Sequence, residues 1–290
     1  MTKYIGRFAP SPTGPLHFGS LLAAVASYLD AKANCGSWLL RMEDLDPPRE
    51  PDGAADQILG QLQALGLCWD GEVLYQSSRL DAYEQILTNL YQRELCYSCD
   101  CTRGQIKAMG SVYNGQCRER TAPPASNSAI RLKTQNIELD FCDAVFGIYR
   151  QNLERDVGDF VIKRKDGLFA YQLAVVIDDA YQGITHIVRG YDLLDSTPRQ
   201  IYLQKLLGYQ TPGYAHIPIV VDDEGNKLSK QQFATAIDIA KGPQLIFQCL
   251  ALLGLSPPND ISGTTTSALL NWALDNWDIQ RVPKLATLHL

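Results

Sequence analysis

The stretch "RFAPSPTGPLHFGS" at residues 7–20 decides the fold. It contains three prolines and two glycines, and it lies between a short apolar segment and an alanine-rich segment. Proline fixes φ and glycine permits positive φ, so such a run specifies one irregular backbone path. Residues 4–9 predict a strand, and residues 17–34 predict a helix that Gly36 ends. A strand, a loop and a helix start in this order are typical of nucleotide-binding α/β sheets, in which the helix N-terminus offers unpaired N–H groups to phosphates.

His17 stands at the predicted helix start, where other nucleotide-binding loops have glycine or lysine. The stretch contains neither G-x-G-x-x-G nor G-x-x-x-x-G-K-[ST]. A histidine here could bond phosphate oxygens, while Gly19 would leave room for a flat base. The residues alone therefore leave two interpretations open, a nucleotide site or a capping loop around a half-buried His17.

Outward from this stretch, the chain alternates strands and helices. Residues 37–42 predict a strand, and residues 53–65 and 80–93 predict helices, which together favour βαβ units and a parallel sheet. The pattern changes at residue 96, and four strand candidates then predict an antiparallel or irregular insertion: 129–133, 145–149, 160–164 and 169–176. Afterwards the α/β pattern resumes with a strand at 184–189, a helix at 198–207, a strand at 215–221 and a mostly helical remainder.

Composition limits the class of protein. The chain has 290 residues, 46% hydrophobic and 20% charged, and a net charge of −6, which is ordinary for a globular protein. It contains no apolar run of the length a transmembrane helix needs and no signal-peptide pattern, so we expect a cytoplasmic protein. An acidic protein binds nucleic acid poorly in general, but residues 96–133 hold six basic and two acidic residues. That basic segment is either a solvated patch or a contact for a phosphate backbone.

Two separated motifs, in the right order, resemble a known family. The stretch 7–20, with HFGS at residues 17–20, is similar to the HIGH-type signature of class I aminoacyl-tRNA synthetases, and KLSKQ at residues 227–231 is similar to their KMSKS loop. RMEDLDPPRE at residues 41–50 and RGYDLLDSTPRQIYLQKLLG at residues 189–208 resemble the glutamyl branch. The resemblance covers roughly residues 3–240.

The resemblance implies an α/β fold with a Rossmann-type parallel sheet in two halves, residues 1–95 and 171–240, the second carrying the KLSKQ loop. Between them it implies an inserted, zinc-bearing, acceptor-like subdomain at residues 96–170, and after them a helical region at 241–290. The sequence ends where full glutamyl-tRNA synthetases continue into an anticodon-binding domain. It thus resembles the truncated members of the branch, which activate L-glutamate with ATP and Mg²⁺ without tRNA. These enzymes attach glutamate to queuosine in the anticodon of tRNA(Asp). A monomer is the default expectation.

Motif positions also imply the site residues for attack of a carboxylate on the α-phosphate of ATP. His17 and Lys230 would be the catalytic residues, and ATP would contact His17, Gly19, Lys227 and Lys230. Glutamate would contact Arg7, Ala9, Ser11, Glu43, Tyr171 and Arg189. Arginine suits a carboxylate because its planar guanidinium can donate two parallel hydrogen bonds. The alternatives are a surface acid for Glu43, a core aromatic for Tyr171 and a basic surface turn for the KLSKQ loop.

The cysteines at residues 96–117 predict a structural zinc site. From the residues alone, the obvious ligands are Cys96, Cys99, Cys101 and Cys117. The resemblance instead implies Cys99, Cys101, Tyr113 and Cys117, with Cys96 as an apolar neighbour, and four unligated thiols are the alternative. The remaining cysteines are isolated and are predicted to be core residues: Cys35, Cys68, Cys142 and Cys249.

Three other functions stay open at this point. The chain could transfer glutamate to an ordinary tRNA 3′ end, or it could be a nucleotidyltransferase that acts on another small acid. It could also be a nonenzymatic relative that binds tRNA through the basic, cysteine-rich segment.

Overall fold

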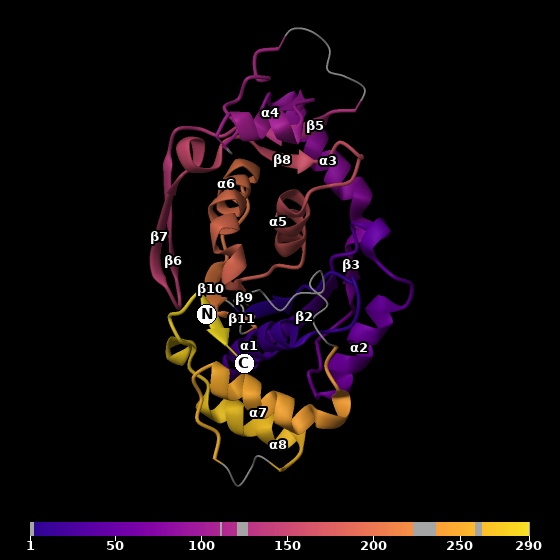
Figure 1. The fold of residues 1–290 in the computed structure, drawn as a ribbon, viewed down its shortest axis with the longest axis vertical. Helices are drawn as coiled ribbons and strands as arrows, with labels where there is room; N and C mark the ends of the chain where they lie inside the picture. The colour runs from indigo at the N-terminus through magenta and orange to yellow at the C-terminus, as the bar shows by residue number, and fades with distance from the viewer. Residues whose placement is uncertain (1–2, 111, 121–126, 223–235, 259–262, 290) are drawn as a thin grey trace.

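A central parallel sheet organises the computed structural model, which describes residues 3–110, 112–120, 127–222, 236–258 and 263–289 (Figure 1). Its first three strands are β1 (Ile5–Phe8), β2 (Ser37–Met42) and β3 (Leu74–Tyr75), in the order β1-β2-β3. The β1–β2 register pairs Ile5 with Ser37 and Phe8 with Leu40. The predicted strand–helix–strand start of the chain is confirmed.

A second group of strands continues this sheet at its β1 edge. The order is β7 (Gly147–Asn152), β6 (Glu138–Asp143), β10 (Gly213–Ile217) and β9 (His186–Gly190), all parallel except β7, which is antiparallel to β6. The Thr185 backbone N–H donates to the Ile5 carbonyl at 2.9 Å, so the strands β9 and β1 lie side by side. The carboxyl ends of β1 and β9 therefore meet where the strand order reverses, which is where open α/β sheets bind ligands.

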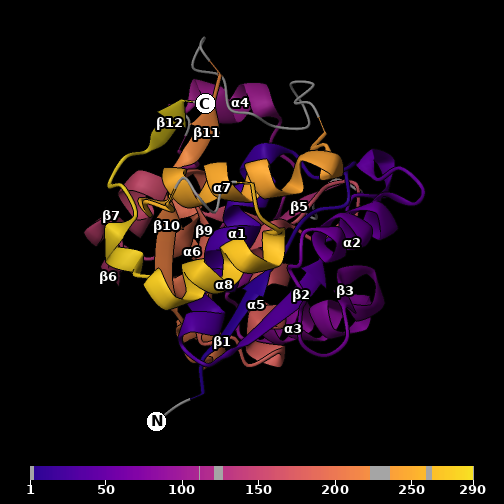
Figure 2. The same cartoon turned by 90° about the horizontal axis from the view of Figure 1, so that it is seen from below.

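Helices cover both faces of the sheet. The helices α1 (Phe18–Ala33), α7 (Gly242–Leu252) and α8 (Thr266–Asn276) lie on one face, as the view from below shows (Figure 2). The helices α3 (Leu80–Gln92), α5 (Tyr171–Tyr181) and α6 (Thr197–Leu207) lie on the other. Alternate residues of β9 divide between the two cores, with Val188 in the first and Ile187 in the second, because successive strand side chains point to opposite faces. The helix α2 (Ala54–Ala64) packs against the first core through Ile58 and Leu62.

A small module lies at the far end of the molecule, at the top of Figure 1. It consists of the antiparallel strands β4 (Cys96–Cys99), β5 (Ala129–Leu132) and β8 (Phe160–Lys163), with the short helix α4 (Arg103–Ala108). Two of the four strand candidates predicted for this segment, 129–133 and 160–164, correspond to β5 and β8. A separate parallel pair joins β11 (Ile219–Val221) to β12 (Thr287–His289). The described residues also include 3₁₀ helices at Pro47–Arg49, Gln76–Arg79, Tyr191–Ser196, Ile239–Lys241 and Ile279–Arg281, and a π-helical turn at Leu153–Val157.

One strand prediction in the second half of the chain is wrong, and two others have different bounds in the structure. Residues 169–176 read as a strand because the segment is rich in apolar and β-branched residues, but the helix α5 begins at Tyr171 and buries every residue from Leu173 to Asp179. A helix buried on most sides loses the periodicity that would identify it. The predicted strand at 145–149 starts two residues before β7 and omits its partner β6, whose exposed face is polar. The predicted strand at 215–221 is interrupted at Pro218, and its two parts, β10 and β11, pair with different strands.

The isolated cysteines do not behave alike. Cys249 is buried, as predicted, but Cys35, Cys68 and Cys142 are exposed. Cys35 follows α1 with a φ of 53°, and Cys142 lies on the outward face of β6. Their position along the backbone leaves these two side chains exposed, although a free thiol is apolar enough to be buried. Among the residues that the structure describes, no helix is long and apolar enough to cross a membrane.

Candidate active site

A cavity of about 610 Å³ opens at the carboxyl ends of β1, β9 and β10. Its walls come from the loop after β1, the first turn of α1, the end of β2, the start of α5 and the segment around Pro218. The structure brings eight predicted site residues to this cavity: Arg7, Ala9, Ser11, His17, Gly19, Glu43, Tyr171 and Arg189. A nucleotide site at this position is consistent with the strand order.

The loop after β1 is held in place by backbone hydrogen bonds from two other elements. The Glu43 N–H, just after β2, donates to the Pro10 carbonyl at 2.9 Å. The Leu16 N–H donates to the side-chain oxygen of Gln61, which α2 buries, at 2.8 Å. Gly14 has a φ of 141°, which an L side chain rarely adopts. The prolines and glycines thus carry the chain across the carboxyl ends of the strands and deliver Glu43 and His17 to one cavity.

His17 caps α1, as the capping-loop interpretation predicts, and it also lines the cavity. The Nδ1 atom of His17 accepts a hydrogen bond from the Ser20 N–H at 3.2 Å, and His17 is 9% exposed. It also forms a bridge with Ala236, and the Ile237 N–H donates to the Leu16 carbonyl at 3.0 Å. Lys227 and Lys230 lie outside the described residues. The chain before them lines the cavity at Val220, and the chain after them returns beside His17.

A buried network of charges forms one wall of the cavity. Arg7 donates from Nε and Nη2 to the two Asp179 carboxylate oxygens at 3.2 and 3.4 Å. Arg41, which is fully buried, lies 2.9 Å from the same carboxylate and 3.4 Å from Glu43. Among the described residues, Arg7 Nη1 has no hydrogen-bond partner, so the side of the guanidinium away from Asp179 is available to a ligand in the cavity.

Burial and charge act differently on the two acids of this network. Burial opposes ionisation of Asp179, but Arg7 and Arg41 together outweigh it and hold its pKa below the usual range. Burial dominates at Glu43 and raises its pKa, although Arg41 and Arg7 act in the opposite direction. The Glu43 side chain is 10% exposed and lines the cavity, so its carboxylate would be stabilised by a cationic group of a ligand there.

Arg189 is held by groups from four elements. Its Nε donates to His216 Nε2 at 3.1 Å, and its Nη2 donates to Thr197 Oγ1 at 2.8 Å and to the Leu193 carbonyl at 3.4 Å. Its Nη1 donates to the Tyr171 hydroxyl at 3.3 Å. Arg189 thus presents only its Nη1 corner, beside Tyr171, to the cavity. Tyr171 lines the cavity and contacts Arg189, so it is more than a core aromatic.

Sequence reasoning missed the residues that hold these arginines. Asp179 and His216 each interrupt a buried apolar run, in VVIDDAY at α5 and YAHIPIV at β10, and Arg41 is the lone charge in the strand SWLLRM. A charged or polar side chain within a buried apolar run usually has a hydrogen-bond or ionic partner. This pattern could therefore have identified Asp179, His216 and Arg41 as members of a buried polar network. The partners themselves are distant in the sequence and could not be identified without the fold.

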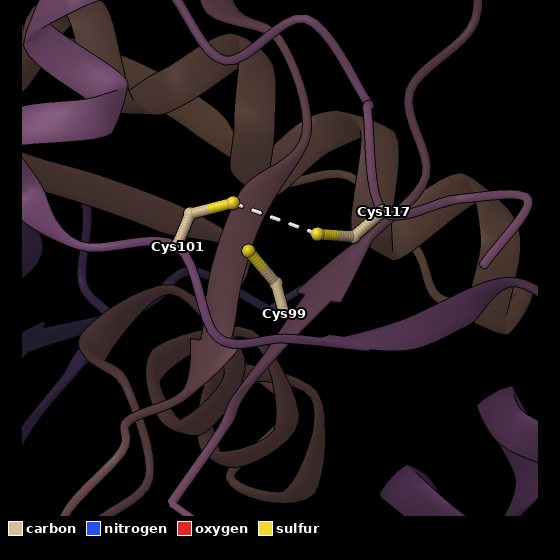
Figure 3. Close-up of side chains that lie close together, drawn as sticks. All are labelled: Cys99, Cys101 and Cys117. Atoms are coloured by element: carbon tan, nitrogen blue, oxygen red, sulfur yellow. Dashed lines mark hydrogen bonds between the residues drawn. The ribbon is translucent and has the colours of Figure 1, made fainter. Parts of the chain in front are cut away.

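The cysteine cluster lies in the small module, away from the cavity. Cys99, Cys101 and Cys117 are buried, and their sulfur atoms lie within 4.8 Å of one another (Figure 3). The sulfur atoms of Cys101 and Cys117 are 3.5 Å apart, close to the roughly 3.8 Å that a tetrahedral site with Zn–S bonds of about 2.3 Å would give. The Tyr113 hydroxyl lies 3.4 Å from the Cys99 sulfur and 3.7 Å from the Cys101 sulfur. These four side chains could hold a metal ion.

Cys96 is excluded from this cluster by strand geometry. It is three residues before Cys99 in β4, so the two side chains point to opposite faces of the strand. Cys96 packs in the second core, where burial raises its pKa to about 12. At Cys99, burial opposes ionisation, but hydrogen bonds with Tyr113 and Arg131 lower the pKa to about 7, which favours the thiolate that metals bind.

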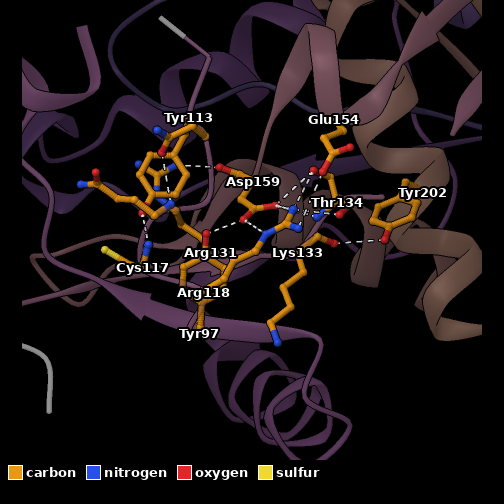
Figure 4. Close-up of polar contacts among 12 residues, drawn as sticks. Tyr97, Tyr113, Cys117, Arg118, Arg131, Lys133, Thr134, Glu154, Asp159 and Tyr202 are labelled. Atoms are coloured by element: carbon orange, nitrogen blue, oxygen red, sulfur yellow. Dashed lines mark hydrogen bonds and ion pairs between the residues drawn. The ribbon is translucent and has the colours of Figure 1, made fainter. Parts of the chain in front are cut away.

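An ion-pair network supports the cluster (Figure 4). Arg118, next to Cys117, donates from Nε to the Asp159 carboxylate at 2.6 Å, and the Thr134 N–H donates to the same carboxylate at 2.7 Å. The guanidinium of Arg131 lies over the Tyr113 ring at 4.0 Å. Because Asp159 is buried and joins several segments, it fixes the cysteine-bearing loop against the antiparallel strands.

The fold is that of an α/β protein with a cavity at the switch point of a parallel sheet, the position at which enzymes of this class bind their ligands. Residues 4–271 match the family described as tRNA synthetases class I (E and Q), catalytic domain. The chain belongs to this family.

Its relatives make the assignment narrower. The chain is 50% identical to the Glutamyl-Q tRNA(Asp) synthetase of Ectopseudomonas mendocina, over 99% of this chain and 97% of that protein. It is 52% identical to the protein of that name from Neisseria meningitidis serogroup C, over 98% of each chain. The structure is similar to a glutamate tRNA ligase from Elizabethkingia meningosepticum, with a TM-score of 0.78 and 26% identity. That match covers 98% of this chain and 66% of the ligase, so the chain spans slightly less than two thirds of that structure.

Proposed function

We propose that the protein activates L-glutamate with ATP, without tRNA, and transfers the glutamate to queuosine in the anticodon of tRNA(Asp). The printed name shared by relatives at 50–52% identity, over nearly the whole of both chains, supports the acceptor. The observation that carries the activation step is the cavity itself, where two arginines and a buried glutamate lie beside a helix N-terminus.

The charges of the cavity complement those of glutamate. Arg7 and Arg189 would each take a carboxylate, and Glu43 would pair with the ammonium group. The side of the Arg7 guanidinium away from Asp179 can donate two hydrogen bonds to one carboxylate. Arg189 offers only its Nη1 group to the other carboxylate, and the Tyr171 hydroxyl would donate the second hydrogen bond there. The backbone at Ala9 and the Ser11 side chain would complete the wall. Glutamine would leave a buried guanidinium without its anionic partner, which disfavours it.

ATP would lie along the start of α1. A glutamate carboxylate oxygen bonds to the α-phosphorus while the bond to the bridging oxygen breaks, and pyrophosphate leaves. The unpaired N–H groups at the helix N-terminus, His17, Lys227 and Lys230 would stabilise the charge on the phosphates, and Gly19 would admit the adenine. Mg²⁺ would supply further positive charge to the triphosphate. The protein's part in such a reaction is positioning and charge stabilisation.

We further propose that Cys99, Cys101, Tyr113 and Cys117 hold one structural Zn²⁺. The ion would fix the module of residues 96–170, whose basic residues would then face RNA, as an insertion between the two halves of the sheet. Residues 241–290 would form the C-terminal region. The protein would act as a monomer in the cytoplasm, where its tRNA substrate is found.

Two assays test this function. Pyrophosphate exchange without tRNA, over a panel of amino acids, should proceed with glutamate and not with glutamine; a better substrate among other small acids would favour a different nucleotidyltransferase. Transfer of labelled glutamate should occur to tRNA(Asp) that carries queuosine. Labelling of a tRNA 3′ end would contradict the proposed acceptor, and folded, zinc-loaded protein without exchange activity would favour a nonenzymatic tRNA binder.

A further inference from the structure

A buried chain of polar groups runs beneath the cavity, from β6 through β10 to β9. Asp143, at the end of β6, is 1% exposed, and His216, in β10, is fully buried. One Asp143 oxygen lies 2.6 Å from His216 Nδ1, and His216 Nε2 lies 3.1 Å from both Arg189 Nε and Thr197 Oγ1. Asp143 and His216 do not line the cavity, so they act on a ligand only through Arg189.

The partners determine which nitrogen of His216 carries the proton. Arginine only donates hydrogen bonds, so His216 Nε2 must accept from Arg189 Nε. The Nδ1 position must then carry the proton and donate to Asp143. Burial lowers the pKa of His216, Asp143 raises it, and the nearby Arg189 lowers it, while Asp192 contributes a smaller effect that raises it. The net direction is downward, which keeps the ring neutral beside the guanidinium.

We propose that Asp143 and His216 are positioning residues for glutamate binding: Asp143 fixes His216 as the neutral Nδ1–H tautomer, and His216 then turns the Nη1 corner of Arg189 toward the cavity. The proposal rests on the proposed function, because it assumes that Arg189 binds a carboxylate of glutamate. Without the acceptor at Nε2, the buried Nε–H of Arg189 would lack a partner, and the guanidinium would lose its orientation toward Tyr171.

The variant Asp143→Asn tests the tautomer with almost no change of shape. The second Asp143 oxygen accepts the backbone N–H groups of Val145 and Phe146 at 3.0 and 2.9 Å. An asparagine would keep its oxygen there and turn its NH₂ group toward His216 Nδ1. The histidine proton would then move to Nε2, which could donate to Thr197 Oγ1 but could no longer accept from Arg189 Nε, so two donors would face each other there.

The kinetic experiment measures pyrophosphate exchange by Asp143→Asn and His216→Phe, with His186→Gln as the control. His186 is a second β-sheet histidine, and it lies outside the cavity. We expect the KM for glutamate to rise about 10- to 100-fold in both variants, because a change of this size corresponds to the loss of one charge-assisted hydrogen bond. The KM for ATP should stay unchanged. An equal rise of both KM values, or an unchanged KM for glutamate in a folded variant, would overturn the proposal.

A second measurement does not depend on the variants. The ¹⁵N shifts of His216 in the wild-type protein should show the neutral Nδ1–H tautomer at neutral pH; an imidazolium or an Nε2–H tautomer would contradict the proposal. The two failures are distinguishable. If the wild-type protein does not exchange pyrophosphate with glutamate, the proposed function fails, whereas an active enzyme with the wrong tautomer or unaffected variants refutes only the positioning role.

Discussion

Asp179→Asn removes the negative charge that lies between Arg7 and Arg41. All three side chains are almost completely buried, at 4%, 4% and 0% exposed, and the carboxylate lies 3.2 Å from Arg7 and 2.9 Å from Arg41. Removing one partner from a buried ion pair costs about 3 to 5 kcal/mol, because the remaining charge stays buried. We therefore expect the free energy of unfolding in denaturant to fall by about that amount.

The same substitution should weaken glutamate binding. Arg7 depends on both Asp179 oxygens for its orientation, so we expect the KM for glutamate in pyrophosphate exchange to rise about 10- to 100-fold, with the KM for ATP unchanged.

The matched control is the adjacent residue in α5. Asp178 is also fully buried, but it accepts hydrogen bonds from Arg79, Gln76 and Tyr83, away from Arg7. Asp178→Asn should therefore lower stability by a similar amount and leave the KM for glutamate unchanged. If Asp178→Asn raises that KM as much as Asp179→Asn does, or if Asp179→Asn matches the wild type in both measurements, the reasoning is refuted.

Three further predictions concern the metal, the backbone and pH. Cys99→Ser should lose the bound zinc measured by elemental analysis, whereas Cys96→Ser should retain about one ion per chain; equal loss from both would refute the assigned ligands. Gly158→Ala should destabilise the protein by more than the roughly 1 kcal/mol expected for Gly167→Ala. Both glycines have positive φ, but only at Gly158 would a Cβ lie 2.5 Å from a backbone oxygen, and similar denaturation midpoints would contradict this. The pKa of Glu43 is raised by burial, and only its ionised form pairs with an ammonium group, so the KM for glutamate should rise as pH falls toward that pKa; a pH-independent KM on the acid side would argue against the pairing.

The sequence could predict the first half of the fold and most of the cavity, since both depend on local pattern. Residues 37–42 form β2 with the predicted bounds, and the prolines and glycines of residues 7–20 mark a loop that leads to a helix start. Arg7, Glu43 and Arg189 come to one cavity because each follows or ends a strand at the same edge of the sheet. The motif positions therefore predicted which residues line one cavity, and their roles toward glutamate stay predictions.

Long-range contacts account for what the sequence could not supply. The helix α5 is buried on most sides, so its apolar residues gave no helical period. Asp143 and His216 are 73 residues apart and meet only because β6 pairs with β10. Cys96 resembles the neighbouring cysteines in the sequence, and only the alternation of β4 separates it from them. For α5 and for the Asp143–His216 pair, the missing information was tertiary contact; for Cys96 it was the presence of a strand.

The most direct test of the central claim is the site at which the enzyme places glutamate. Labelled glutamate, ATP and the enzyme are incubated with tRNA(Asp) that carries queuosine and with tRNA(Asp) that lacks it, and the tRNA is then cleaved into fragments. We predict label only on the queuosine-containing tRNA and only in its anticodon fragment. Equal labelling of both tRNAs, or label in the 3′-terminal fragment, would contradict the account.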